Sequence, residues 1–161
     1  MFTADEVSIP ARFEVAAAQL TGLINRGGLR SACEAAYAEG LAAELTASPS
    51  SRAQKFPQLV RVLFLEPAYR GGTMTIALRW EATGVAGEVF PMLDANLILA
   101  RDGDGHSLLT LAGSYRPPFG AAAASTAAMH RLATAANRSL LAHIADTIAT
   151  PHHNDSPQPA R

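Results

Sequence analysis

The 161-residue sequence contains a single cysteine, Cys33. One cysteine excludes an internal disulfide, and it also excludes a zinc site built from several thiolates. Cys33 lies in an Ala-rich stretch with helical spacing, where an unpaired cysteine usually acts as a small buried apolar side chain. We therefore expect Cys33 to fill space in the core and not to act as a nucleophile.

The sequence has no excess of charge of either sign. Its 13 Lys and Arg residues are matched by 14 Asp and Glu residues, so the formal net charge is -1. Such a chain has no global positive field that could release counterions from nucleic acid. We expect no nucleic-acid partner.

Long apolar runs are also missing. No stretch approaches the roughly 20 residues that span a bilayer. The acidic start, Met1 to Glu6, lacks the basic region of a secretory signal. We expect no membrane span and a cytoplasmic protein.

The motifs of several common enzyme classes do not occur. There is no Gly-x-Gly-x-x-Gly, no Walker loop and no Gly-x-Ser-x-Gly, so nucleotide binding and serine hydrolysis have no support. The run Asp102 to Gly105 lacks the remaining ligands of a calcium loop and predicts a hairpin turn. His152, His153 and Asp155 lie in a stretch that we expect to be flexible, which could not hold a metal in a fixed geometry. We expect no cofactor and no metal.

What the sequence does contain is a regular order of strand and helix patterns. We expect one domain over residues 1–150 and a disordered tail over 151–161. The expected elements are a strand at 6–9, helices at 13–24 and 29–45, strands at 59–65, 73–83, 89–100 and 106–116, and a helix at 121–149. Short turns join the last four strands, which predicts an antiparallel meander, and a one-sided sheet of this kind packs against a one-sided helix. The predicted class is α+β, with a curved antiparallel sheet wrapped round a long C-terminal helix and two short helices after the first strand.

Four segments carry a resemblance to a known superfamily. They are VRVLFLEP at 60–67, LRWEATG at 78–84, FPMLDANL at 90–97 and YRPPFG at 115–120. Together with the order of elements, they resemble the START/polyketide cyclase (SRPBCC) superfamily, in particular its small uncharacterised bacterial members with a helix-grip fold. The resemblance implies a cavity between the concave sheet face and the final helix that holds lipids, polyketides or other apolar molecules. Only about four meander strands are expected in this sequence, whereas many members of the superfamily have six. A shorter sheet is compatible with a cavity that is shallow or filled with side chains.

The resemblance and the strand patterns together nominate a ligand-binding set. Its members are Met74, Ile76, Leu78, Arg79, Trp80, Phe90, Asp94, Tyr115, Met129, Ala133 and Asn137. Polar residues on strands that are predicted to pair, Arg79, Glu81, Asp94 and Arg116, could meet across the sheet. Cross-strand ion pairs on a solvated face are the favoured interpretation, and a polar cluster inside a ligand cavity is the alternative.

Three functions follow from this set, in order of preference. The first is binding of an apolar small molecule between the sheet and the terminal helix, without catalysis. The second is a cyclase or aromatase that would need an acid or base facing inward, and some members of the superfamily have these activities. The third is a partner-binding scaffold, such as a homodimer formed through an exposed sheet edge.

Overall fold

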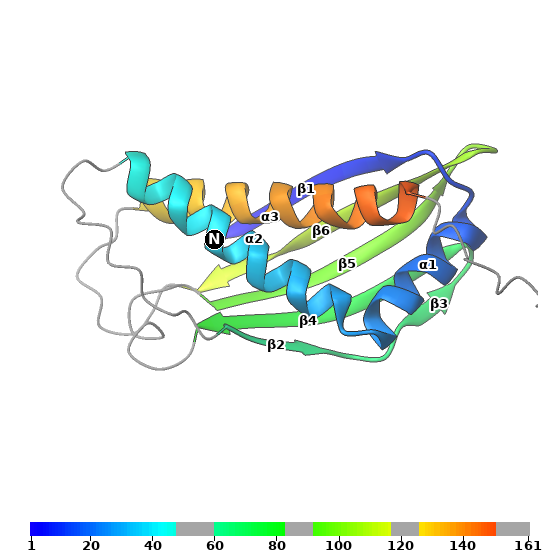
Figure 1. Cartoon of the computed structure of the whole chain (residues 1–161), viewed down its shortest axis with the longest axis horizontal. Coiled ribbons are helices and arrows are strands. Elements are labelled where there is room, and N and C mark those ends of the chain that lie inside the picture. Colours follow the sequence, from blue (N-terminus) through cyan, green and yellow to red (C-terminus); the bar gives the residue numbers. More distant parts are fainter. Residues whose placement is uncertain (48–59, 83–91, 117–125, 151–161) are drawn as a thin grey trace, which may run out of the picture.

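The computed structural model describes residues 1–47, 60–82, 92–116 and 126–150. Its elements, coloured along the chain in Figure 1, are β1 (Phe2–Ile9), α1 (Phe13–Asn25), α2 (Gly28–Ala47), β2 (Val60–Phe64), β3 (Ala68–Arg70), β4 (Thr73–Ala82), β5 (Met92–Asp102), β6 (His106–Arg116) and α3 (Thr126–Ala149).

All the strands form one antiparallel sheet in the order β1-β6-β5-β4-β2, and the short β3 pairs with β4 beyond the end of β2. Glycines with positive φ make the tight turns between neighbouring strands. Gly71 (φ 54°) and Gly72 (φ 79°) join β3 to β4, and Gly103 (φ 71°) joins β5 to β6. Because these turns are short, they fix the register of the strands on either side.

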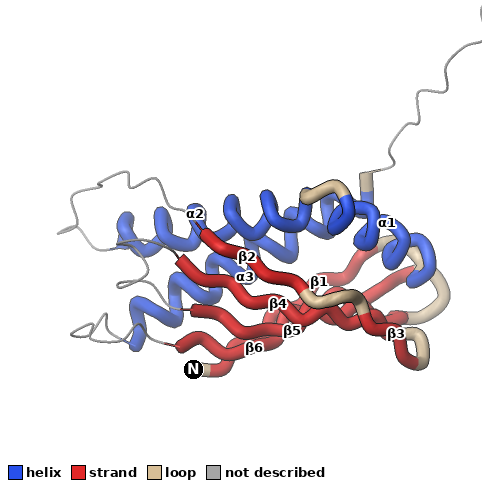
Figure 2. Tube along the Cα trace, turned by 90° about the horizontal axis from the view of Figure 1, so that it is seen from below, coloured by secondary structure: helices blue, strands red, loops and turns tan. Residues whose placement is uncertain are grey.

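The three helices of the described residues lie on one face of the sheet (Figure 1 and Figure 2). α3 packs beside α2, and Gly40 of α2 permits the close approach. A Cβ atom at position 40 would lie 2.9 Å from both the Cβ of Ala136 and the carbonyl oxygen of Leu132. No element in the described part of the chain covers the other face, which we call the open face.

The core lies between the sheet and the helices, and it is built by strict alternation along the strands. On β4, for example, Met74, Ile76, Leu78 and Trp80 face the helices and are buried. Trp80 packs against Tyr37 of α2, with ring centroids 5.4 Å apart. The predicted helix-facing side of this strand is therefore confirmed.

The predicted fold class is confirmed, including the two helices after the first strand and the long terminal helix. Among the strand boundaries, the largest difference is in β1, which begins at Phe2 instead of residue 6, and β5 extends two residues further than expected, to Asp102. β3 was not predicted, since three residues after Pro67 are too few to show an alternating pattern. The expected tail at 151–161 lies outside the described residues. None of the described helices is long and apolar enough to cross a membrane.

Candidate functional site

The space between the sheet and α3, where the ligand was expected, is filled with side chains over the described residues. Ile76 and Leu97 on the sheet have no accessible surface, and neither have Ala136 and Leu140 on α3. A void able to admit even one water would leave accessible surface on the side chains around it. No ligand therefore fits beside these four side chains, and the predicted ligand position between the sheet and α3 stays a prediction.

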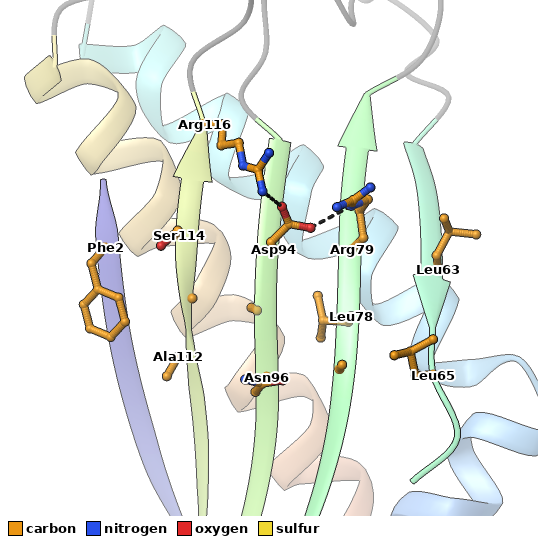
Figure 3. Close-up of a pocket in the computed structure, with 13 residues that line it drawn as sticks. Phe2, Leu63, Leu65, Leu78, Arg79, Asp94, Asn96, Ala112, Ser114 and Arg116 are labelled. Atoms are coloured by element: carbon orange, nitrogen blue, oxygen red, sulfur yellow. Dashed lines mark hydrogen bonds and ion pairs between the residues drawn. The ribbon is translucent and has the colours of Figure 1, made fainter. Parts of the chain in front are cut away.

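A hollow of about 730 Å³ lies instead on the open face of the sheet (Figure 3). Its lining comes from five strands: Phe2, Leu63, Leu65, Ala77, Leu78, Arg79, Asp94, Ala95, Asn96, Ala112, Gly113, Ser114 and Arg116. The volume lies within the range of pockets that hold small molecules.

Strand register explains why the open face is hollow at this point. Ala77, Asn96 and Ala112 lie side by side across β4, β5 and β6 and form a floor of short side chains. Same-face neighbours along a strand are two residues apart, about 6.6 Å. The next row in one direction contains the larger Ile98, and the next row in the other direction contains Arg79 and Asp94. The low row between taller rows makes the depression.

Apolar side chains stand at both sides of this floor. Phe2 at the β1 edge has 69% of its surface exposed, and Leu63 and Leu65 near the β2 edge have 51% and 69% exposed. Figure 3 shows them on opposite sides of the hollow. Large exposed side chains of this kind, gathered on one face, are typical of interaction sites.

Three charged residues form a cluster at one end of the hollow. Arg79 on β4 is opposite Asp94 on β5 in the register, and its Nε donates to Asp94 Oδ1 at 2.6 Å. Arg116 on β6 approaches from the other side, with Nη2 2.8 Å from Asp94 Oδ2. The Asp94 hydrogen bond and charge raise the pKa of Arg79 above its ordinary value. The sequence-based prediction that these residues meet is confirmed, and they lie on the open face.

The fourth predicted member, Glu81, pairs with a different residue. Its carboxylate lies 3.4 Å from Arg61 Nη1 on β2. Among the described residues, three guanidinium groups and two carboxylates therefore share this end of the sheet. The N-terminal ammonium of Met1 donates to the carbonyl oxygen of Tyr115 at the same end, at 2.8 Å, so positive charge is in excess there. The side chains of Arg79 and Arg116 are 47% and 66% exposed, so both can be reached from the hollow.

A separate polar network lies inside the protein, between β1, β6 and α3. Tyr115 Oη donates to Asn137 Oδ1 at 3.0 Å, and Asn137 Nδ2 lies 3.2 Å from both Thr3 Oγ1 and Asp5 Oδ2. Burial raises the pKa of the Tyr115 phenol above its ordinary value. Tyr115 and Asn137 were both predicted to contact a ligand, but in the structure they bind each other and do not line the hollow.

The remaining predicted site residues divide between the core and its margin. Met74, Ile76, Trp80 and Ala133 are buried core residues, and Met129 on α3 is half-buried. Leu78 is also buried but borders the hollow. Phe90 lies outside the described residues. His130 shares the helical spacing of Asn137, yet it is exposed whereas Asn137 is fully buried.

The sequence-based set omitted most of the hollow's apolar lining, notably Phe2, Leu63 and Ala112. Alternation carried a usable signal for two of them. Leu63 lies between the inward-facing Val62 and Phe64, and Ala112 follows the buried Leu111. The pattern places both on the face opposite the core.

The site shows no arrangement that favours catalysis over binding. Asp94, the carboxylate of the hollow, is paired with two guanidinium groups. The Cys33 thiol is buried, which raises its pKa to about 12, and Cys33 does not line the hollow. Among the described residues, no three His, Cys, Asp or Glu side chains gather as a metal site would require.

Comparison with known proteins gives distant structural similarities, two of which are described below. No protein-family model matches the chain, and no curated protein matches it. An uncharacterised protein from Bacillus thuringiensis aligns over 89% of this chain and 98% of its own, with 13% identity and a TM-score of 0.38. The Zhui aromatase/cyclase from Streptomyces sp. R1128 aligns over 89% of this chain and 93% of its own, with 11% identity and a TM-score of 0.30. With TM-scores this low, neither structure indicates what this protein binds.

Proposed function

We propose that this protein binds an apolar small molecule, and that the molecule occupies the hollow on the open face of the sheet. One observation carries the proposal. A depression of about 730 Å³ with exposed apolar sides and a charged end lies on the open face, whereas the described side chains on the other face are packed without voids.

The lining of the hollow has the composition of a ligand site. Apolar walls favour transfer of an apolar molecule from water, and a few polar groups at one end fix its orientation. Phe2 and Leu63 supply the walls, Ala77 and Ala112 the floor, and Arg79 a polar end. Membership of the START/polyketide cyclase superfamily stays a prediction. It is compatible with this proposal, but the proposal does not depend on it.

The experiment is a titration with N-phenyl-1-naphthylamine, an uncharged probe that fluoresces in apolar surroundings. A double variant, Ala77→Leu/Ala112→Leu, would raise the floor of the hollow. The control is Thr73→Leu/Ala100→Leu. Thr73 and Ala100 are opposite each other on β4 and β5 and lie on the same face of the sheet, but they do not line the hollow. We expect saturable binding to the native protein and to the control, and at least a fivefold weaker affinity for the floor variant.

Native mass spectrometry of the purified protein provides an independent measurement. A co-purified small mass that is retained by the control and lost from the floor variant would support the proposal. Equal affinity of the floor variant and the native protein for the probe would contradict it, because the hollow could not then be the binding site.

A further inference from the structure

The charged cluster at the end of the hollow has donors to spare. Each guanidinium carries five N–H groups in a planar fork. Arg79 contacts Asp94 through Nε, and Arg116 contacts it through Nη2, so the contacts within the described part of the chain use only one N–H-bearing nitrogen of each residue. In Figure 3 the two guanidinium groups lie on either side of the Asp94 carboxylate, above the hollow.

The charge balance at this end of the sheet selects the sign of a ligand. Asp94 neutralises one of the two guanidinium groups that flank it, and the nearby Glu81 is paired with Arg61. The N-terminal ammonium of Met1 lies at the same end, bonded to the carbonyl oxygen of Tyr115. Among the described groups, positive charge is therefore in excess beside an apolar surface, and an anionic ligand group would offset it.

The same row of side chains places the charge and the apolar walls together. One row of paired residues crosses the open face from β1 to β2. In order, its members are Phe2, Ser114, Asp94, Arg79 and Leu63. An anionic group held at the arginines would direct an attached apolar body over the floor of short side chains. The hollow is thus suited to a molecule that is charged at one end.

We infer that the ligand of the hollow is an apolar carboxylate, with its carboxylate bound by Arg79 and Arg116 and its apolar part lying over the floor of Ala77, Asn96 and Ala112. This inference rests on the proposed function, because it assigns a chemical class to the ligand of that same site. Forked guanidinium donors match the geometry of a carboxylate, which adds direction to the charge attraction.

The test compares cis-parinaric acid, a fluorescent fatty acid, with its uncharged methyl ester. We expect the acid to bind the native protein about five- to tenfold more tightly than the ester, a factor reduced by the exposure of the arginines. Arg116→Gln removes one of the two guanidinium groups proposed to hold the carboxylate and leaves the other, Arg79, neutralised by Asp94, so it should abolish the preference for the acid. Asp94→Asn frees both guanidinium groups and should strengthen binding of the acid severalfold.

Two controls make the outcomes separable. Ester binding should be unchanged in both charge variants, and Arg101→Gln, which alters a charge at the far end of β5, should leave the acid preference intact. Equal binding of acid and ester, with both weakened by Ala77→Leu/Ala112→Leu, would refute the carboxylate while the hollow stood as a binding site. Binding of acid and ester that the floor variant does not alter would refute the site itself.

Discussion

The buried hydrogen bond between Tyr115 and Asn137 can be tested by a double-mutant cycle. Tyr115 is 2% exposed and Asn137 is 0% exposed, so neither polar group can exchange its partner for water. Tyr115→Phe removes the phenolic donor and leaves Asn137 Oδ1 buried without it. An unsatisfied buried acceptor costs about 1–3 kcal/mol of stability. We expect Tyr115→Phe to lower the free energy of unfolding by about 2 kcal/mol.

The second arm of the cycle is Asn137→Leu. This substitution leaves the Tyr115 hydroxyl with only the carbonyl oxygen of Ala133, 3.5 Å away, and it also removes the amide that donates to Thr3 and Asp5. We expect a loss of about 2–3 kcal/mol. When both partners of a buried hydrogen bond are replaced by apolar groups of similar shape, no polar group is left unpaired, so the loss of stability is smaller than the two single losses suggest. The double variant should therefore lose about 1 kcal/mol less than the sum of the two single losses.

Urea denaturation followed by circular dichroism gives the measurement. With a slope of about 2 kcal/mol/M, a loss of 2 kcal/mol lowers the midpoint by about 1 M without changing the slope. Tyr69→Phe is the control, because Tyr69 is 59% exposed and its hydroxyl lies near Thr21 on the surface. If Tyr115→Phe costs no more than Tyr69→Phe, or if the two losses at Tyr115 and Asn137 simply add, the network does not stabilise the core as argued.

Three further outcomes follow from the structure. Gly40→Ala should lower the free energy of unfolding by about 1–3 kcal/mol, because the added Cβ would press on Ala136. Gly105→Ala should change it by less than about 0.5 kcal/mol, because a Cβ at position 105 meets open space. Chemical denaturation measures both variants. The free energy of unfolding should fall as the pH rises from about 9 to about 12. In this range Cys33 ionises in the unfolded chain, whereas in the folded protein the buried thiol, with a pKa raised to about 12, stays protonated. A Cys33→Ala variant that shows the same fall would exclude Cys33 as its cause. Asp94→Asn should change the unfolding free energy by less than about 1 kcal/mol, because both arginines that pair with Asp94 are exposed. A larger loss in the same assay would contradict the small stabilisation expected of these ion pairs.

The faces of the strands could be predicted from the sequence, but the hollow could not. Alternation along β4 assigns Trp80 to the core and Arg79 to the opposite face, and the structure confirms both. Alternation does not state which residues of neighbouring strands lie side by side. The floor exists only because Ala77, Asn96 and Ala112 share one row, and that depends on the register set by the turns at each end.

The close packing between the helices and the sheet could not be predicted from the sequence pattern either. A stripe of small residues on α2 and α3 is compatible either with a cavity beside the sheet or with helices that approach closely. Gly40 against Ala136 shows the second outcome. Likewise, Tyr115 and Asn137 have the polar groups expected of a ligand site, and only their mutual distance of 3.0 Å reveals that they satisfy each other. Residue type alone does not distinguish these cases.

The energetic cost of opening each side of the sheet favours the open face as the binding site. A ligand between the sheet and α3 would have to separate fully buried side chains such as Met74, Leu99, Leu111 and Ile144. An apolar ligand would cover these side chains again, but each contact that it made would replace one that the folded protein already has, so little apolar surface would be newly removed from water. A ligand on the open face displaces no packed group and covers Phe2 and Leu63, which are already exposed.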